Sequence, residues 1–226
     1  SAIDIDRDAD QPDPVFPPIR PPCRSEWPAF AAEMGLVGMG GSHFPASRKL
    51  AAATRIHTLI INAVECEPGI EIDEALLLHA PASVEAGIDL LTQSLEIPTR
   101  ILALKKSARH RLAHTLSRLH LRLLPMPDRY PAGAERLIVE QAAGRRPPVG
   151  CLPVHLGYLV LSVASLWAIG RRIREGRPSI DRPLTLRVPG QPARNLIVPV
   201  GTPVETLLSR AGIATPPPDG LVAVAG

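Results

Sequence analysis

The chain has 226 residues, a length that predicts one sizeable domain and a smaller module, because single cores grow to roughly 150–200 residues. Its formal net charge is only +3, and its basic residues are spread out without interleaved aromatic side chains, which argues against nucleic-acid binding. The three cysteines, Cys23, Cys66 and Cys151, form no C-x-x-C pair, so a zinc ribbon and a cysteine-ligated iron–sulfur cluster are excluded for this chain alone. No stretch reaches the roughly 18–20 apolar residues that span a bilayer, so we expect no direct membrane insertion.

The first 28 residues are acidic and then proline-rich. This composition buries too little apolar surface to offset the entropy lost on ordering, so a tail or linker is predicted over residues 1–28. A short helix over about 29–34 is expected to lead into the glycine run that follows.

Strands and helices alternate over residues 29–178. Short apolar runs predict buried strands at 57–62, 100–105, 121–126 and 158–163. Helical periodicity predicts helices between and after them, at 73–80, 81–95, 107–120, 134–144 and 164–176. This alternation is typical of an α/β fold, a Rossmann-like parallel sheet with helices on both faces.

The pattern changes from Asp181 onward. Residues 183–188 and 195–200 flank the turn sequence PGQPAR and predict a hairpin. A helix follows, for which Thr202 is the expected N-cap with Pro203 and Glu205 in the first turn. LVAVA predicts a last strand. Two strands, a helix and a strand over 182–226 are typical of a small β-grasp module.

The stretch GLVGMGGSHFP (35–45) places four glycines in seven positions before a bulky His-Phe-Pro. A dinucleotide-binding fingerprint has the spacing G-x-G-x-x-G after a strand, whereas here the spacing is G-x-x-G-x-G-G after an expected helix. Two interpretations remain. The backbone N–H groups face an anion or a flat ring, with Lys49 near enough to meet a phosphate, or the glycines only let two segments pack closely. Composition alone favours close packing.

A second polar segment, NAVECEPGIEID (62–73), begins where the strand at 57–62 ends. The carboxyl edge of a parallel sheet is where open α/β folds place their ligands. Asn62 offers an amide that can pair with a heterocycle, and Glu65 and Glu67 are acceptors without a basic neighbour in sequence. Either glutamate alone is explained by a solvated surface or a helix dipole. The combination with the glycine run predicts a ligand site.

Other patterns carry less chemistry. His110 and His114 have a spacing that can chelate a metal, but nearby arginines favour a solvated helix face, and no metal site is predicted. Asp73 and Glu74 are expected to start a helix rather than to catalyse. Cys66 is most simply an inert loop cysteine.

The segment GLVGMGGSHFPASRKL resembles the flavin loop of RnfC, the peripheral subunit of the Rnf electron transport complex. It is more distantly similar to the NADH-binding flavoprotein subunit of respiratory complex I. LIINAVECEPGIEIDEALL, RYPAGAERLI and GRRPPVGCLPVHLG resemble three further RnfC segments. Four motifs in the same order make the match specific, although it does not separate RnfC from a cobalamin-reductase relative.

The resemblance implies a domain that binds FMN and NADH over 29–178, followed by an SLBB-type β-grasp module over 182–226. Gly38, Gly40 and Gly41 would line FMN, and Lys49 would contact its phosphate. Asn62 and Glu65 would edge the ring, and Phe44 and Glu67 would help hold the nicotinamide nucleotide. Tyr130, Gly133 and Glu135 would complete the pocket, with His43 stacked on the ring or occupying its place.

The resemblance further implies electron transfer from NADH through flavin to 4Fe-4S clusters outside this chain. Its partners would be other subunits of a complex at the cytoplasmic side of the inner membrane. The chain alone, whether an excised fragment or a naturally short paralogue, is expected to be unable to pass electrons onward. Some positions depart from the family pattern: Ser42 and His43 replace Ala-Gly, Ser162 replaces Asn, and Ala63 and Ala134 replace Gly. They leave open an alternative, a cofactor-free scaffold module of the same fold.

Overall fold

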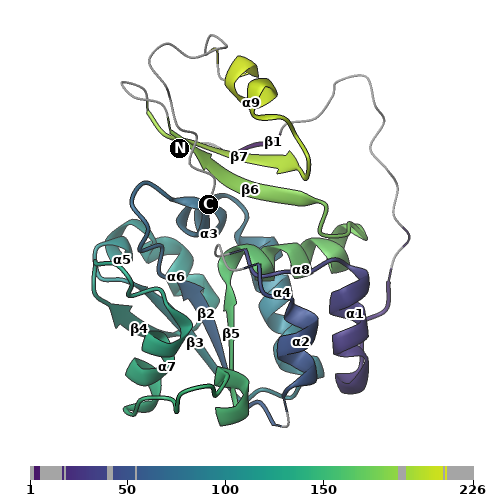
Figure 1. Cartoon of the computed structure of the whole chain (residues 1–226), viewed down its shortest axis with the longest axis vertical. Coiled ribbons are helices and arrows are strands. Elements are labelled where there is room, and N and C mark those ends of the chain that lie inside the picture. The colour runs from purple at the N-terminus through teal and green to yellow at the C-terminus, as the bar shows by residue number, and fades with distance from the viewer. Residues whose placement is uncertain are drawn as a thin grey trace.

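The computed structural model of this chain describes residues 3–5, 17, 19–39, 43–53, 55–187, 192–210 and 212. These residues form two sheets. The larger has four strands in the order β4-β3-β2-β5, and the smaller has three in the order β1-β7-β6. The smaller sheet and helix α9 lie at the top of Figure 1, above the helices that surround the larger sheet.

The larger sheet consists of β2 (Thr58–Ala63), β3 (Thr99–Lys105), β4 (Arg122–Met126) and β5 (Tyr158–Ser162). All three pairings are parallel, and the four strands lie where the sequence predicts them. From the central β2 the chain adds β3 and β4 on one side and then β5 on the other. The strand order therefore reverses between β2 and β5, the kind of switch point at which open α/β sheets bind ligands.

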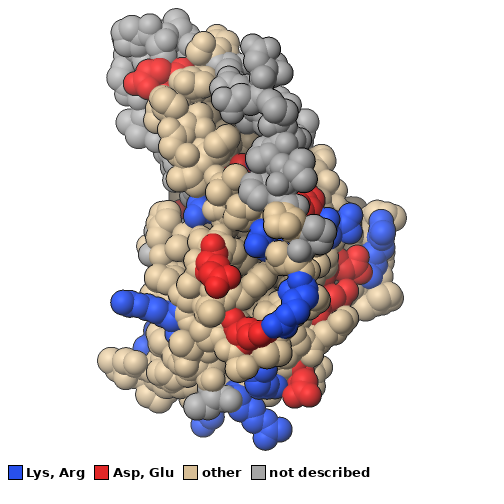
Figure 2. All heavy atoms as spheres, turned by 90° about the vertical axis from the view of Figure 1, so that its right-hand side faces the viewer, with Lys and Arg blue, Asp and Glu red and all other residues tan. Residues whose placement is uncertain are grey.

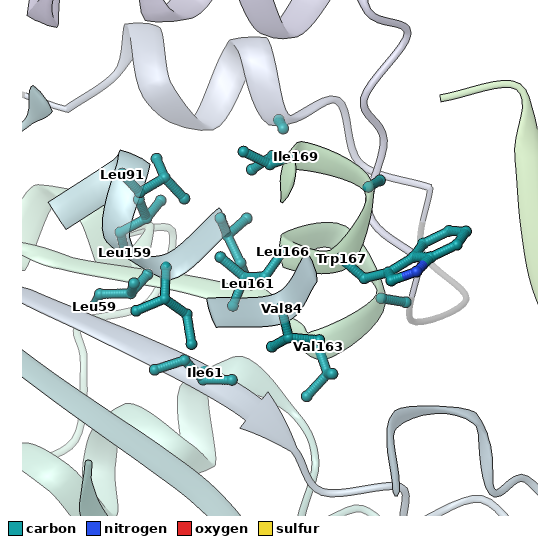
Figure 3. Packing of buried hydrophobic residues seen from close by; sticks show 14 of the residues in the cluster. Leu59, Ile61, Val84, Leu91, Leu159, Leu161, Val163, Leu166, Trp167 and Ile169 are labelled. Carbon is teal, nitrogen blue, oxygen red and sulfur yellow. The ribbon is translucent and has the colours of Figure 1, made fainter. Parts of the chain in front are cut away.

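Helices cover both faces of this sheet, as predicted. On one face Leu59 and Ile61 of β2 and Leu159 and Leu161 of β5 pack against α4 (Pro81–Ser94) and α8 (Val163–Glu175), in the cluster of Figure 3. The same cluster takes buried residues from α1 (Trp27–Glu33), α2 (Ala46–Ala51) and α3 (Ile72–His79). On the opposite face, Ile60 and Val160 pack against Ile138 and Val139 of α7 (Glu135–Ala143).

Some local expectations need correction. The single helix predicted over 107–120 is two short helices, α5 (Ala108–Arg111) and α6 (Ala113–Leu119). They separate at Leu112, whose backbone leaves helical geometry with φ −93° and ψ 3° while its side chain stays buried. Helix α2 and the 3-10 turns η1 (Arg24–Glu26) and η2 (Pro153–Leu156) were not predicted.

Two parts of the segment predicted as a tail form secondary structure instead. Ile3–Ile5 is strand β1, which pairs in parallel with β7. At the other end, Trp27 begins α1 because its indole is buried, packs edge-on against Phe30 with ring centroids 5.3 Å apart, and donates to Ser94 Oγ at 2.7 Å. The aromatic ring supplies the apolar burial that the surrounding composition lacks.

The predicted hairpin is present as β6 (Asp181–Leu186) and β7 (Arg194–Pro199), which pair antiparallel. Helix α9 (Val204–Arg210) follows, but the Thr202 hydroxyl donates to the Pro199 carbonyl at 2.7 Å. The first helical amides bond to the Pro203 carbonyl, so the helix begins one residue later than predicted. The strand expected at LVAVA lies outside the described residues, and the β-grasp assignment and domain boundaries stay predictions.

The surface seen in Figure 2 carries Lys and Arg side chains next to Asp and Glu side chains rather than gathered by sign. Among the helices of the described part of the chain, none combines the length and the apolar character that crossing a membrane requires.

Candidate functional site

The candidate site lies at the switch point between β2 and β5. Asn62 and Ser162 are register partners at the carboxyl ends of these strands. Two adjoining pockets open there, and they share Met39, Asn62, Gly133, Ala134 and Ser162. The predicted glycine segment and the acidic segment thus converge on one place.

We name the pockets by the segments that line them. The loop pocket, about 360 Å³, is lined in addition by Gly38, Phe44, Lys49, Glu135, Leu152, Val160, Leu161 and Ser165. The turn pocket, about 220 Å³, is lined in addition by Val64, Glu65, Cys66, Glu67, Ile70, Ile72, Asp73, Tyr130, Pro131 and Pro183.

Lys49 is the buried cation of the loop pocket. It projects from α2 with only 8% of its surface exposed, although lysine is rarely buried without a partner. Its ammonium donates to the Val160 carbonyl at 2.9 Å and forms an ion pair with Glu135, at the first position of α7. An ammonium has three protons, so Lys49 retains the capacity to bind an anionic group entering the pocket.

Asn62 fixes the boundary between the pockets. Its Nδ2 donates to the Gly133 carbonyl at 3.0 Å, and its Oδ1 accepts from the Val64 amide at 3.0 Å. Position 133 must be glycine, because a Cβ there would lie 2.3 Å from the Val64 carbonyl oxygen. The Gly133 amide also donates to Cys66 Sγ at 3.3 Å. These contacts hold the loop before α7 against the end of β2.

Two carboxylates in the wall of the turn pocket cap helices. Glu65 accepts from the Asp73 and Glu74 amides at 2.7 and 3.2 Å, and Asp73 Oδ1 accepts from the Ala164 amide of α8 at 3.0 Å. Burial raises the pKa of Glu65, opposed by the α3 amides that donate to it. Burial and the neighbouring Glu65 charge raise the pKa of Asp73 well above its ordinary value. Asp73 and Glu74 do start a helix, as predicted, while the Glu65 oxygens face that helix.

Asp73→Asn is expected to flatten the dependence of stability on pH. A carboxyl whose folded pKa is raised contributes stability below its unfolded pKa and loses it as the pH rises through the folded value. The wild-type free energy of unfolding should therefore fall as the pH rises above 3.8, the ordinary aspartate value. Asparagine keeps the oxygen that accepts from Ala164 and removes the charge. Urea denaturation across the pH range measures the difference.

The control is Asp89→Asn, which removes a half-exposed carboxylate paired with Arg100 at 2.7 Å. This change leaves Glu65 and Asp73 in place, so the fall in stability above pH 3.8 should persist. If the free energies of unfolding of the wild type and of Asp73→Asn changed in parallel with pH, ionisation of the buried pair Glu65 and Asp73 would not lower stability, and the prediction would be wrong.

Nine of the predicted site residues line the two pockets: Gly38, Phe44, Lys49, Asn62, Glu65, Glu67, Tyr130, Gly133 and Glu135. His43 is exposed at φ +49° and is not among the described residues that line either pocket. Gly40 and Gly41 lie outside the described residues. The binding roles of all these residues stay predictions.

Sequence reasoning missed Met39, Leu152 and Pro183. Met39 lines both pockets, and its place inside the glycine run is the one signal that could have pointed to it. Pro183 reaches the turn pocket from β6, and no sequence pattern placed that strand beside the site. Ser162, noted only as a departure from the family pattern, is the N-cap of α8, where its hydroxyl accepts from the Ser165 amide at 3.1 Å.

Comparison with known proteins relates the chain to a family and to a fold. Residues 31–171 match the family model described as the Nuo51 FMN-binding domain. The RnfC protein of the ion-translocating oxidoreductase complex of Pseudomonas aeruginosa is 37% identical over 204 residues, which cover 86% of this chain and 26% of that protein. Its counterpart from Rhodobacter capsulatus is 31% identical over 221 residues, covering 92% of this chain and 42% of that protein. The chain thus spans less than half the length of these relatives.

A chain of an NAD+-reducing [NiFe]-hydrogenase in the H2-reduced state shares the fold, with a TM-score of 0.67 and 23% identity over 83% of this chain and 39% of that chain. The resemblance to RnfC is confirmed by the two relatives of that kind. Since the family model covers more than half of its 226 residues, the chain belongs to the Nuo51 FMN-binding domain family.

Proposed function

We propose that the chain binds FMN and NADH, as the flavin-bearing part of an RnfC-like subunit of a membrane-associated electron transport complex. The single observation that carries the proposal is the buried Lys49 ammonium in the wall of a pocket at the sheet's switch point. Family membership and the relatives' names point to the same chemistry.

The residues of the loop pocket fit FMN. Its volume, about 360 Å³, falls within the roughly 300–1,000 Å³ of small-molecule sites. Lys49 is the group to hold a phosphate, and Asn62 offers an amide at the pocket boundary. Met39, Phe44 and Leu152 supply apolar surface for a flat ring. When bound, FMN accepts two electrons as hydride and releases them singly, so the protein has only to bind, orient and exclude water.

The turn pocket is the proposed place of the nicotinamide nucleotide. Glu67 and Tyr130 stand exposed at its edge, with 70% of Tyr130 accessible, so they can contact a ligand that comes and goes. The iron–sulfur clusters that receive the electrons and the partner subunits belong, in this proposal, to the longer protein and its complex.

The cofactor-free alternative predicted a pocket filled by His43. The two pockets are open, and His43 is not among their described lining residues. This observation favours ligand binding over the scaffold alternative.

Incubation with FMN followed by desalting is expected to leave a protein with flavin absorption bands. Lys49→Gln should weaken FMN binding by about 10- to 100-fold, because charge-assisted hydrogen bonds contribute roughly 1.5–3 kcal/mol. The same change should leave riboflavin binding nearly unaltered, since riboflavin has no phosphate. Flavin fluorescence titration measures both affinities.

Lys106→Gln is the matched control, because Lys106 is exposed and borders a separate groove near α5. It should bind FMN as the wild type does. A colourless wild-type protein whose melting temperature does not respond to FMN or NADH would refute the proposal, as would equal losses in the two lysine variants.

A further inference from the structure

We propose that the small sheet positions the acidic turn, residues 65–71, and thereby sets the affinity of the turn pocket. The residues assigned this role are Thr185 on β6 and Arg187 just beyond it. The part of the inference that concerns nucleotide affinity rests on the proposed function. The part that concerns the position of the turn does not.

The Arg187 side chain contacts both the main chain of the turn and one of its side chains. Its Nε donates to the Gly69 carbonyl at 2.7 Å, and its Nη2 donates to Glu71 Oε1 at 2.8 Å. A Cβ at position 69 would lie 2.7 Å from Arg187 Nε, so the bare glycine leaves room for the guanidinium. Both bonds have a charged donor, which strengthens them, while the half-exposed side chains of Arg187 and Glu71 let solvent screen part of that gain.

Thr185 makes the second attachment, which is buried. Its hydroxyl accepts from the Glu71 amide at 3.1 Å and donates to Asn195 Oδ1 on β7 at 2.8 Å. Thr185 and Asn195 are each only 1% exposed. The Glu71 amide is thus bonded to a hydroxyl whose orientation is fixed by the neighbouring strand.

The small sheet that carries these contacts is itself attached to the helices around the larger sheet. At its start, β6 is joined to α8 through Asp181, which accepts from Arg171 at 2.7 Å in a buried ion pair. Farther along, Pro183 of β6 lines the turn pocket itself. Figure 1 shows β6 passing above α3, the helix that follows the turn.

The middle of the acidic turn is held by weak hydrogen bonds. Glu65 is tied to the α3 amides, but within the described structure the bonds of the middle part are Gly133 N to Cys66 Sγ at 3.3 Å and Ile70 N to Glu67 O at 3.5 Å. The position of Glu67 therefore depends on the anchor that Arg187 provides at Gly69 and Glu71. Loss of that anchor should let the turn open more often.

The first test uses binding. Arg187→Ala is expected to weaken NADH binding by about tenfold, which corresponds to the loss of one or two hydrogen bonds from the charged side chain. FMN affinity should stay at the wild-type value, because Arg187 is not among the described residues that line the loop pocket. Arg187→Lys should recover part of the NADH affinity. Arg182→Ala is the matched control, since Arg182 lies on β6 and bonds to Ser179 rather than to the acidic turn.

The second test needs no cofactor. In a Cys23→Ser, Cys151→Ser background, Cys66 is the remaining cysteine, and its rate of alkylation by iodoacetamide reports opening of the turn. Arg187→Ala and Thr185→Val are each expected to raise this rate by about tenfold, and Arg182→Ala should not change it. Urea midpoints of all variants separate local opening from global unfolding.

The outcomes are distinguishable. Unchanged alkylation in both Arg187→Ala and Thr185→Val overturns the positioning role, whatever the ligand results. Faster alkylation with unchanged NADH affinity keeps the positioning role and overturns its effect on binding. A wild-type protein that binds neither FMN nor NADH refutes the proposed function, and the alkylation rates still decide whether the small sheet holds the turn.

Discussion

Gly170→Ala is expected to destabilise the protein by about 3 kcal/mol, although alanine is ordinarily the better helix former. A Cβ at Gly170 in α8 would lie 1.7 Å from the Ser83 carbonyl oxygen of α4, and a Cβ at Gly87 would lie 2.0 Å from the Leu166 carbonyl oxygen. The two helix backbones touch at these glycines. Since main-chain atoms cannot rotate away, the added methyl must push the helices apart and loosen the packing around Leu166 seen in Figure 3.

The control uses the same helix. At exposed Arg174, replacement by alanine should give a protein more stable than replacement by glycine by about 1 kcal/mol, the ordinary difference in helix propensity. At position 170 the order of stability should be the opposite, with glycine giving a more stable protein than alanine. Urea denaturation of the four proteins gives the free energies of unfolding, and a Gly170→Ala variant as stable as the wild type would contradict the close approach of α4 and α8.

Local signals account for the parts of the fold that the sequence predicts correctly. The runs that became β2 and β5 are apolar throughout because both faces of the sheet are covered, and this pattern is visible in one short window. Gly144, with φ +69°, ends α7 where a C-terminal glycine is expected. The meeting of the glycine segment and the acidic segment at one sheet edge was also predicted, because Asn62 lies at the end of β2 and Glu65 follows it.

Features that depend on distant partners were not predictable in the same way. Ile3–Ile5 becomes a strand only because β7, at the other end of the chain, offers its edge. The pairing of Lys49 with Glu135 joins residues on different helices, so neither position alone indicates it. Gly87 and Gly170 did carry a signal, since a glycine within a helical pattern often has a packing reason.

The junction between α8 and β6 supplies the other large expected effect. Asp181→Ala should lower the free energy of unfolding by about 3–5 kcal/mol, because it removes the carboxylate that pairs with buried Arg177 and one of the two carboxylates that pair with buried Arg171. Asp181 accepts from Arg171 at 2.7 Å and from Arg177 at 2.7 and 3.2 Å, and all three residues are under 9% exposed. Arg171 also lies over the Trp167 ring, 4.9 Å from its centroid. The cluster joins α8 to the first residue of β6.

Glu175→Ala is the matched control, because Glu175 pairs with the same Arg171 at 2.9 Å but has a half-exposed side chain. An exposed pair contributes roughly 0–1 kcal/mol, so this variant should unfold close to the wild-type urea midpoint. Asp181→Ala removes a buried carboxylate from Arg171 and Arg177, whereas Glu175→Ala removes a half-exposed carboxylate from Arg171 alone, so the contrast compares a buried ion cluster with an exposed pair. Equal midpoints for Asp181→Ala and Glu175→Ala would show that the junction is solvated, and β6 would then lack the firm attachment that positioning the acidic turn requires.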